Sequence, residues 1–97
     1  MTFIQLKYIL TIAETKSLNK AAEQLYVSQP SLTNALKELE KEIGITIFFR
    51  SGRGVTLTND GVEFLTYARE LYHEYEQLLH RYTEGGSYKK KFAVSTQ

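Results

Sequence analysis

The sequence predicts a mainly α-helical protein in which three short helices and a two-stranded hairpin precede one long helix. Three observations support this fold class. Apolar residues recur at helical spacing over residues 3–43, a β-branched and aromatic run at Ile45–Phe49 interrupts that spacing, and helical spacing then resumes as far as Gly85-Gly86. The chain of 97 residues has room for one domain with a modest core, which excludes large catalytic folds.

The first two helices are expected at about Phe3–Thr15 and Leu18–Leu25. Thr2 and Gln5 have the spacing of a capping box, in which the two side chains bind free backbone amides at a helix start. Ser17 is the expected cap of the second helix. That helix carries small residues, which allow another helix to approach closely.

A third helix is expected after a turn at Tyr26-Val27. Ser28 is its expected cap, Pro30 fits the first helical turn, and Gly44 is a natural stop. One apolar stripe runs along it, consisting of Leu32, Leu36, Leu39 and Ile43.

The hairpin is predicted from strands at Ile45–Phe49 and Val55–Leu57 around a turn at 51–54. Thr58 or Asn59 then caps the long helix, which is expected to reach the glycine pair after roughly 25 residues. The domains are therefore residues 1–58, the helix at 59–84, and a hinge at 85–97 that leads into a further domain.

The net charge of +1 conceals an uneven distribution along the chain. Residues 1–58 hold seven basic and five acidic residues, net +2, whereas residues 59–84 hold two basic and six acidic residues, net −4. Residues 85–97 add three lysines and no acid, net +3. Because electrostatics acts through local fields, the weakly basic segment at residues 1–58 is compatible with an anionic partner.

The second and third expected helices, joined by a three-residue turn, match the helix-turn-helix arrangement, and the hairpin follows them. A helix N-terminus carries free N–H groups and a partial positive charge, so it favours phosphates while its first-turn side chains reach DNA base edges. The candidate DNA-binding side chains are Gln29, Ser31, Thr33, Asn34 and Lys37 on the third helix, with Arg50 and Arg53 on the hairpin.

At these residues the sequence resembles the N-terminal winged helix-turn-helix domain of LysR-type transcriptional regulators, over about residues 3–84. The resemblance implies a winged helix-turn-helix, in which the hairpin is the wing, followed by a long dimerisation or linker helix. The matching positions are Ser17-Leu18-Asn19-Lys20-Ala21-Ala22, Leu25, Ser28-Gln29-Pro30, Leu36, Leu39-Glu40, Gly44, Phe48, Arg50, Leu57-Thr58 and Gly61. The resemblance implies double-stranded DNA as partner, bound at an interrupted palindrome by a dimer or by a tetramer of dimers. It also implies a following effector domain that senses a small molecule, with its first strand at 91–95 and no cofactor in the present chain.

The resemblance also implies a role for individual residues. Base contacts fall on Gln29, Pro30, Thr33 and Asn34, and backbone and wing contacts fall on Ser17, Asn19, Lys37, Arg50 and Arg53. Many members carry arginine where this chain has Asn34.

The long helix carries a 3-4-3-4-3 pattern of apolar and aromatic residues, which is typical of a helix–helix seam. The predicted dimer interface consists of Leu65, Ala68, Tyr72, Tyr75, Leu79 and Tyr82. A second line, at Phe64, Leu71 and Leu78, lies beside it, so one flank is expected on the winged domain and the other on a second chain. In the resembling family the two helices pair antiparallel.

The composition predicts a cytoplasmic protein that is not an enzyme. The absence of cysteine excludes disulfides and thiolate metal sites, and the longest apolar-rich stretch, Tyr8–Ala13, is too short to cross a bilayer. His73 and His80 lie seven residues apart, but no third ligand completes a metal site. No nucleophile, base and oxyanion-binding group occur together.

Two rival functions stay open at this point. The chain could be a complete winged-helix DNA binder of another family, or a winged-helix protein-interaction module that does not bind DNA. Binding to DNA at low salt distinguishes the second rival, because even non-specific binding is strong under those conditions.

Overall fold

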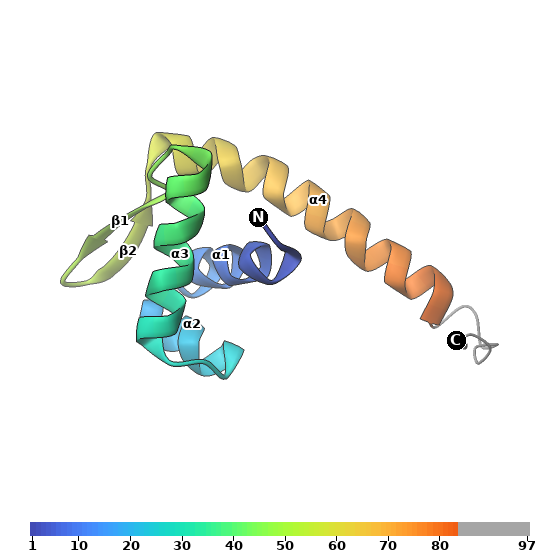
Figure 1. Cartoon of the computed structure of the whole chain (residues 1–97), viewed down its shortest axis with the longest axis horizontal. Coiled ribbons are helices and arrows are strands. Elements are labelled where there is room, and N and C mark those ends of the chain that lie inside the picture. Colours follow the sequence, from blue (N-terminus) through green and yellow to red (C-terminus); the bar gives the residue numbers. More distant parts are fainter. Residues whose placement is uncertain (84–97) are drawn as a thin grey trace.

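The computed structural model describes residues 1–83, which form four helices and one antiparallel hairpin. The three short helices and the hairpin make one body, from which the long helix projects (Figure 1). The predicted mainly α-helical winged fold is confirmed. The predicted hinge and start of a further domain at 85–97, with the glycine pair expected to end the long helix, lie outside the described residues. The elements are α1 (Phe3–Thr15), α2 (Leu18–Leu25), α3 (Gln29–Ile43), β1 (Phe48–Ser51), β2 (Gly54–Leu57) and α4 (Asn59–Thr83).

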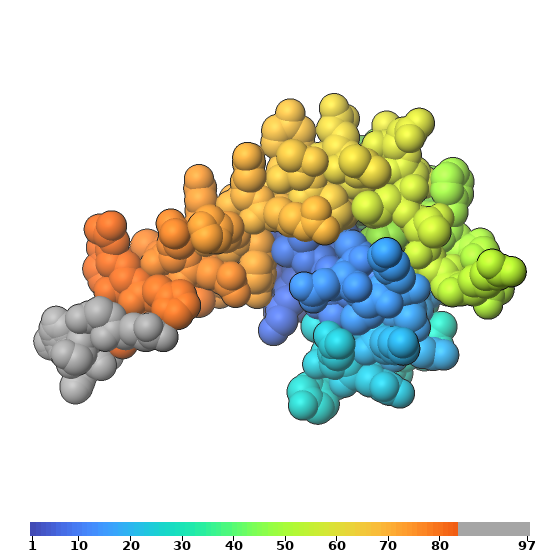
Figure 2. All heavy atoms as spheres, turned by 180° about the vertical axis from the view of Figure 1, so that it is seen from behind, coloured from blue at the N-terminus to red at the C-terminus, as the bar shows by residue number. Residues whose placement is uncertain are grey.

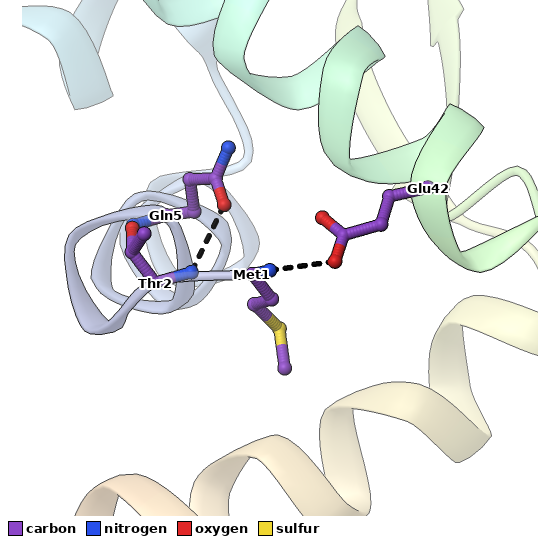
Figure 3. A network of polar contacts seen from close by, with 4 residues as sticks. All are labelled: Met1, Thr2, Gln5 and Glu42. Atoms are coloured by element: carbon purple, nitrogen blue, oxygen red, sulfur yellow. Dashed lines mark hydrogen bonds and ion pairs between the residues drawn. The ribbon is translucent and has the colours of Figure 1, made fainter.

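The start of α1 is held by the predicted capping box. The Thr2 hydroxyl accepts the Gln5 amide hydrogen at 3.1 Å, and the Gln5 side chain accepts that of Thr2 at 3.0 Å. The amine of Met1 also donates to Glu42 at 2.6 Å, which joins the chain start to α3 (Figure 3). Because the Glu42 side chain is about half exposed, this ion pair contributes roughly 0–1 kcal/mol.

The predicted caps of α2 and α3 and the predicted stop of α3 are confirmed. The Ser17 hydroxyl accepts the Lys20 amide hydrogen and the Ser28 hydroxyl accepts that of Ser31, each at 3.2 Å. Gly44 closes α3 in the left-handed conformation, with φ at +79°. The turn between α2 and α3 therefore runs from the left-handed C-cap Tyr26 to the hydroxyl cap Ser28, which fixes where α3 begins.

The core lies where α1 meets the other helices and the hairpin, because α1 packs on α2, α3, α4 and β2. Ala21 and Ala22 allow the close approach of α2. The core side chains are Ile9, Ile12, Leu18, Ala21, Ala22, Leu32, Leu36, Leu39, Ile47, Phe48, Val55 and Leu65.

The first strand begins later than the sequence predicts, at Phe48 rather than Ile45. The N–H of Ile47 donates to the Glu40 side chain, and its carbonyl accepts from the Thr58 amide, so this residue is hydrogen-bonded outside the sheet. The hairpin pairs Phe48 with Leu57 at one end and Ser51 with Gly54 at the other. A two-residue turn at 52–53 results.

The long helix has a buried half and an exposed half. Thr58 is its cap, because its hydroxyl accepts the Gly61 amide hydrogen at 2.8 Å. Gly61, Leu65 and Ala68 are the buried residues of α4, and none of residues 69–83 is buried. Figure 2 shows this second half extending away from the body.

Candidate nucleic-acid interface

The polar first half of α3 lies at the surface. Pro30, Ser31, Asn34 and Lys37 are exposed, while Gln29 and Thr33 are half-buried. Residues at i, i+3 and i+4 share a helix face, so 30, 33, 34 and 37 form one continuous strip. This strip carries amide, hydroxyl and ammonium groups, which suit contact with base edges and phosphates.

Ser31 is engaged by the cap of its own helix. The Ser28 hydroxyl donates to the Ser31 hydroxyl at 2.9 Å. A hydroxyl that accepts one hydrogen bond still has its own hydrogen to donate. The Ser31 hydroxyl therefore still has its own hydrogen to donate, and its position is fixed by the cap.

The wing is held against the body through Gly54. This residue has φ at +129°, and a Cβ added to it would lie 2.5 Å from the Lys16 carbonyl oxygen. The same carbonyl accepts the Val55 amide hydrogen at 3.2 Å. Only glycine allows this close approach, which places Arg53 at the tip of the hairpin beside the start of α2.

The start of α2, the start of α3 and the wing surround one surface depression of about 350 Å³. It brings together five of the predicted DNA-binding residues, and it contains two arginines and no acidic side chain. The strip from Pro30 to Lys37 continues along α3 outside it. The depression is lined by Ser17, Leu18, Asn19, Gln29, Arg50, Ser51, Gly52, Arg53, Gly54 and Val55.

Ser51 is a lining residue that sequence reasoning missed. Its hydroxyl accepts the Arg53 amide hydrogen at 3.3 Å and donates to the Gly54 carbonyl at 3.4 Å, which stabilises the tip of the wing. The available signal was a serine directly before a glycine in a tight turn.

Arg50 contacts α3 as well as facing the depression. Its guanidinium donates to the Thr33 hydroxyl at 3.5 Å, the long end of the hydrogen-bond range. The hairpin register explains this contact, because Arg50 pairs with Val55 and shares the sheet face that turns toward the body. Arg50 therefore links the wing to α3.

The predicted dimer interface requires a correction at its first two positions. Leu65 is 1% exposed and Ala68 is 4% exposed, so both side chains lie in the core of their own chain. The 3-4 spacing identifies the apolar face of α4, but α1 covers the first part of that face. These two residues are not available to a partner.

The next two positions also face α1. Tyr75 stacks on Phe3, with ring centroids 4.3 Å apart, and Tyr72 lies 5.8 Å from Tyr75. Burial raises the pKa of Tyr72, and the charges of Glu76 and Tyr75 raise it further. Both tyrosines are half-buried, so a partner could contact only their outer edges.

The last predicted positions, Leu79 and Tyr82, are exposed. Leu71 and Leu78, which the sequence placed on the second line, are exposed as well. We call these four residues the distal face. The distal end of α4 and the wing lie at opposite ends of the molecule (Figure 1), so the two surfaces can be occupied at the same time.

Two kinds of site are absent from residues 1–83. No helix in this range is long and apolar enough to span a membrane. No group of three or more His, Cys, Asp or Glu side chains in it is arranged to hold a metal ion.

The sequence matches a family model described as bacterial regulatory helix-turn-helix protein, lysR family, over residues 3–62. The transcriptional regulator CitR of Bacillus subtilis is 41% identical over 98 residues, which cover 98% of this chain. The alignment covers 34% of CitR, so the chain spans about a third of that relative.

Two solved complexes have the same fold as this chain. The CbnR_DBD–DNA complex matches with a TM-score of 0.80 and 36% identity, over 89% of this chain and 99% of that one. The BenM_DBD/benA site 1 DNA complex matches with a TM-score of 0.79 and 33% identity, over 84% and 94%. The rival assignment to another winged-helix family is thereby excluded, and the chain belongs to the LysR family of bacterial regulatory helix-turn-helix proteins.

Proposed function

We propose that this chain binds double-stranded DNA sequence-specifically as a homodimer, with α3 in the major groove and the wing on the backbone or minor groove. The observation that carries the proposal is the single surface formed by the start of α2, the polar strip of α3 and the wing arginines. The CbnR and BenM domains with this fold are in complexes with DNA, which supports the same partner here. Chromosomal DNA places such a regulator in the cytoplasm.

The roles of the side chains follow from their chemistry. Gln29 and Asn34 carry amides that bind adenine through two hydrogen bonds, and Thr33 offers a methyl group to thymine. Ser17, Asn19, Lys37, Arg50 and Arg53 contact phosphates or the minor groove. Pro30 and Ser31 complete the surface of the first turn.

The small charge of the winged domain makes dimerisation part of the proposal. Residues 1–58 carry only +2, and affinity for DNA rises with the number of phosphates that basic groups neutralise. A second copy doubles those contacts, and the distal face supplies exposed apolar area for joining the two copies. The acidic charge of α4 then lies away from the DNA. The tetramer and the small-molecule effector implied by the family resemblance stay predictions.

Selection of bound sequences from random duplexes tests the proposal. The wild-type chain should recover an interrupted palindrome. Asn34→Ala should lose about 1–3 kcal/mol of discrimination at one base pair of each half-site. Asn59→Ala is the matched control, because Asn59 is exposed at the start of α4 and outside the proposed interface.

Two outcomes would contradict the proposal. An unchanged base preference in Asn34→Ala would remove the assigned reading role of α3. Failure of the wild-type chain to retard any DNA at low salt would favour the protein-interaction module instead.

A further inference from the structure

A polar junction at Ile47 joins α3, the proposed recognition helix, to α4. The Glu40 carboxylate on α3 accepts the Ile47 amide hydrogen at 2.7 Å and lies 3.4 Å from the Phe48 amide nitrogen. On the other side, the Thr58 amide donates to the Ile47 carbonyl at 3.0 Å. One peptide segment therefore binds α3 through its N–H groups and the cap of α4 through its carbonyl.

Thr58 adds a second set of hydrogen bonds to this junction. Its hydroxyl donates to the Thr46 carbonyl at 2.5 Å and accepts the Gly61 amide hydrogen at 2.8 Å. Thr58 is 8% exposed, and it is the one polar residue among residues 1–83 that is buried. Buried polar groups of this kind need their partners, so the hydroxyl has little freedom to move.

Gly61 permits the junction to be this tight. A Cβ added to Gly61 would lie 2.1 Å from the Ile47 carbonyl oxygen, a distance that no side chain can occupy. The first turn of α4 therefore sits directly on the backbone of residue 47. The start of α4 is therefore in direct contact with Ile47, whose amide is bound by Glu40 of α3.

The junction matters because α4 packs mainly on α1 and β2. Apolar packing on α1 gives stability but little directional preference, whereas hydrogen bonds depend steeply on angle. The Glu40–Ile47–Thr58 connection is thus the directional link between α3 and α4.

We propose that Glu40 and Thr58 are positioning residues that set the angle between α3 and α4, and through it the distance between half-sites that the dimer accepts. This inference rests on the proposed function. In a dimer joined through the distal faces, a change of angle at residue 47 displaces both recognition helices. One added base pair turns a half-site by about 35° around the DNA axis, so the preferred spacing reports the angle directly.

Spin-label distance measurements test the geometry without DNA. The chain has no native cysteine, so cysteines replacing the exposed residues Glu38 on α3 and Gln77 on α4 can be labelled uniquely. Labelled chains are diluted with unlabelled chains, so that only distances within one chain are observed. One narrow distance population is expected for the parent, and a broader population for Thr58→Val and for Glu40→Ala.

Conservative variants and a matched control separate positioning from general stability. Thr58→Ser keeps the hydroxyl and Glu40→Gln keeps an acceptor oxygen, so both should retain the narrow population. Thr66→Val is the control, because the Thr66 hydroxyl donates only within α4, to the Val62 carbonyl at 3.1 Å. If Thr58→Val fails to fold, Glu40→Ala performs the same test from the α3 side.

The spacing of half-sites gives the second readout. With half-sites recovered by selection, the wild type and Thr66→Val should favour one spacing by about tenfold over a spacing changed by one base pair. Thr58→Val should lose that preference and keep the base preference within each half-site. Equal distance widths in Thr58→Val and Thr66→Val, or an unchanged spacing preference, would overturn the inference. Absence of any DNA binding by the wild type would instead refute the proposed function, while the spin-label distances would still judge the junction.

Discussion

The two halves of α4 have the same apolar spacing but different surroundings. In the first half, Leu65 and Ala68 are buried against the winged domain. In the second half, Leu78 and Leu79 are 58% and 45% exposed. Helical periodicity identifies which face of a helix is apolar, but it does not identify the body that covers it. The first half of α4 thus belongs to the fold of one chain, and we propose that the second half contacts a partner.

The largest expected effect is on stability, where substitutions in the two halves of α4 should differ. Leu65→Ala removes most of a fully buried side chain and should lower the free energy of unfolding by about 2–5 kcal/mol. Leu78→Ala shortens an exposed side chain and should change the free energy of unfolding of the winged domain by about 0.5 kcal/mol or less. Urea denaturation at one fixed chain concentration measures both, and equal losses would contradict the division.

The second prediction concerns association. Leu79→Glu places a charge on the distal face and should weaken the dimer by at least about 2 kcal/mol, roughly 30-fold in dissociation constant. Sedimentation velocity over a range of concentrations detects the shift toward monomer. Glu63→Gln, on an exposed part of the first half, is the control. A dimer that survives Leu79→Glu would place the interface elsewhere.

The third prediction concerns the far end of the molecule. Arg53→Ala should weaken DNA binding and lower the slope of log K against log salt concentration by about 1 for each chain, because one phosphate contact is lost. Arg69→Ala removes the same charge from α4 and should leave the slope unchanged. Fluorescence titration at several salt concentrations measures the slope, and equal slopes for both variants would count against contact by the wing.

The smallest effect lies at the boundary between the two halves. The pKa of Tyr72 is raised from its ordinary value of 10.0, first by burial and then by Glu76 and Tyr75. The folded chain therefore holds this proton more tightly than the unfolded chain, so the stabilisation is complete below pH 10 and is lost as pH rises through the folded-state pKa. Glu76→Gln should lower the pKa of Tyr72, as measured by NMR titration of the tyrosine ring carbons. An unchanged pKa would show that Glu76 does not act on it.

Local signals predicted most of the fold. The capping residues Thr2, Ser17 and Ser28 and the stop at Gly44 act within a few residues of themselves, so their roles could be predicted from spacing alone. The strand boundary at Phe48 could not be predicted, because Glu40 and Thr58, which bind the peptide of residue 47, are distant in sequence. Propensity alone favours a strand through Ile45.

The candidate site shows the same division between local and distant effects. The polar strip from Pro30 to Lys37 follows from helical spacing, and the structure places it at the surface as predicted. The contact of Arg50 with Thr33 and the burial of Leu65 and Ala68 depend on tertiary packing. Sequence patterns predicted that the candidate DNA-binding residues of α3 lie on an exposed face, but they could not assign the partners of α4.

The most direct test compares two duplexes, one carrying both half-sites recovered by selection and one carrying a single half-site. The wild type should bind the first at least about 100-fold more tightly, because two joined copies share the binding event. Leu79→Glu should bind the single half-site as the wild type does and lose the added affinity for the pair. A variant weakened equally on both duplexes, or a wild type without preference for the pair, would contradict the assignment of DNA to the winged domain and of the second copy to the distal half of α4.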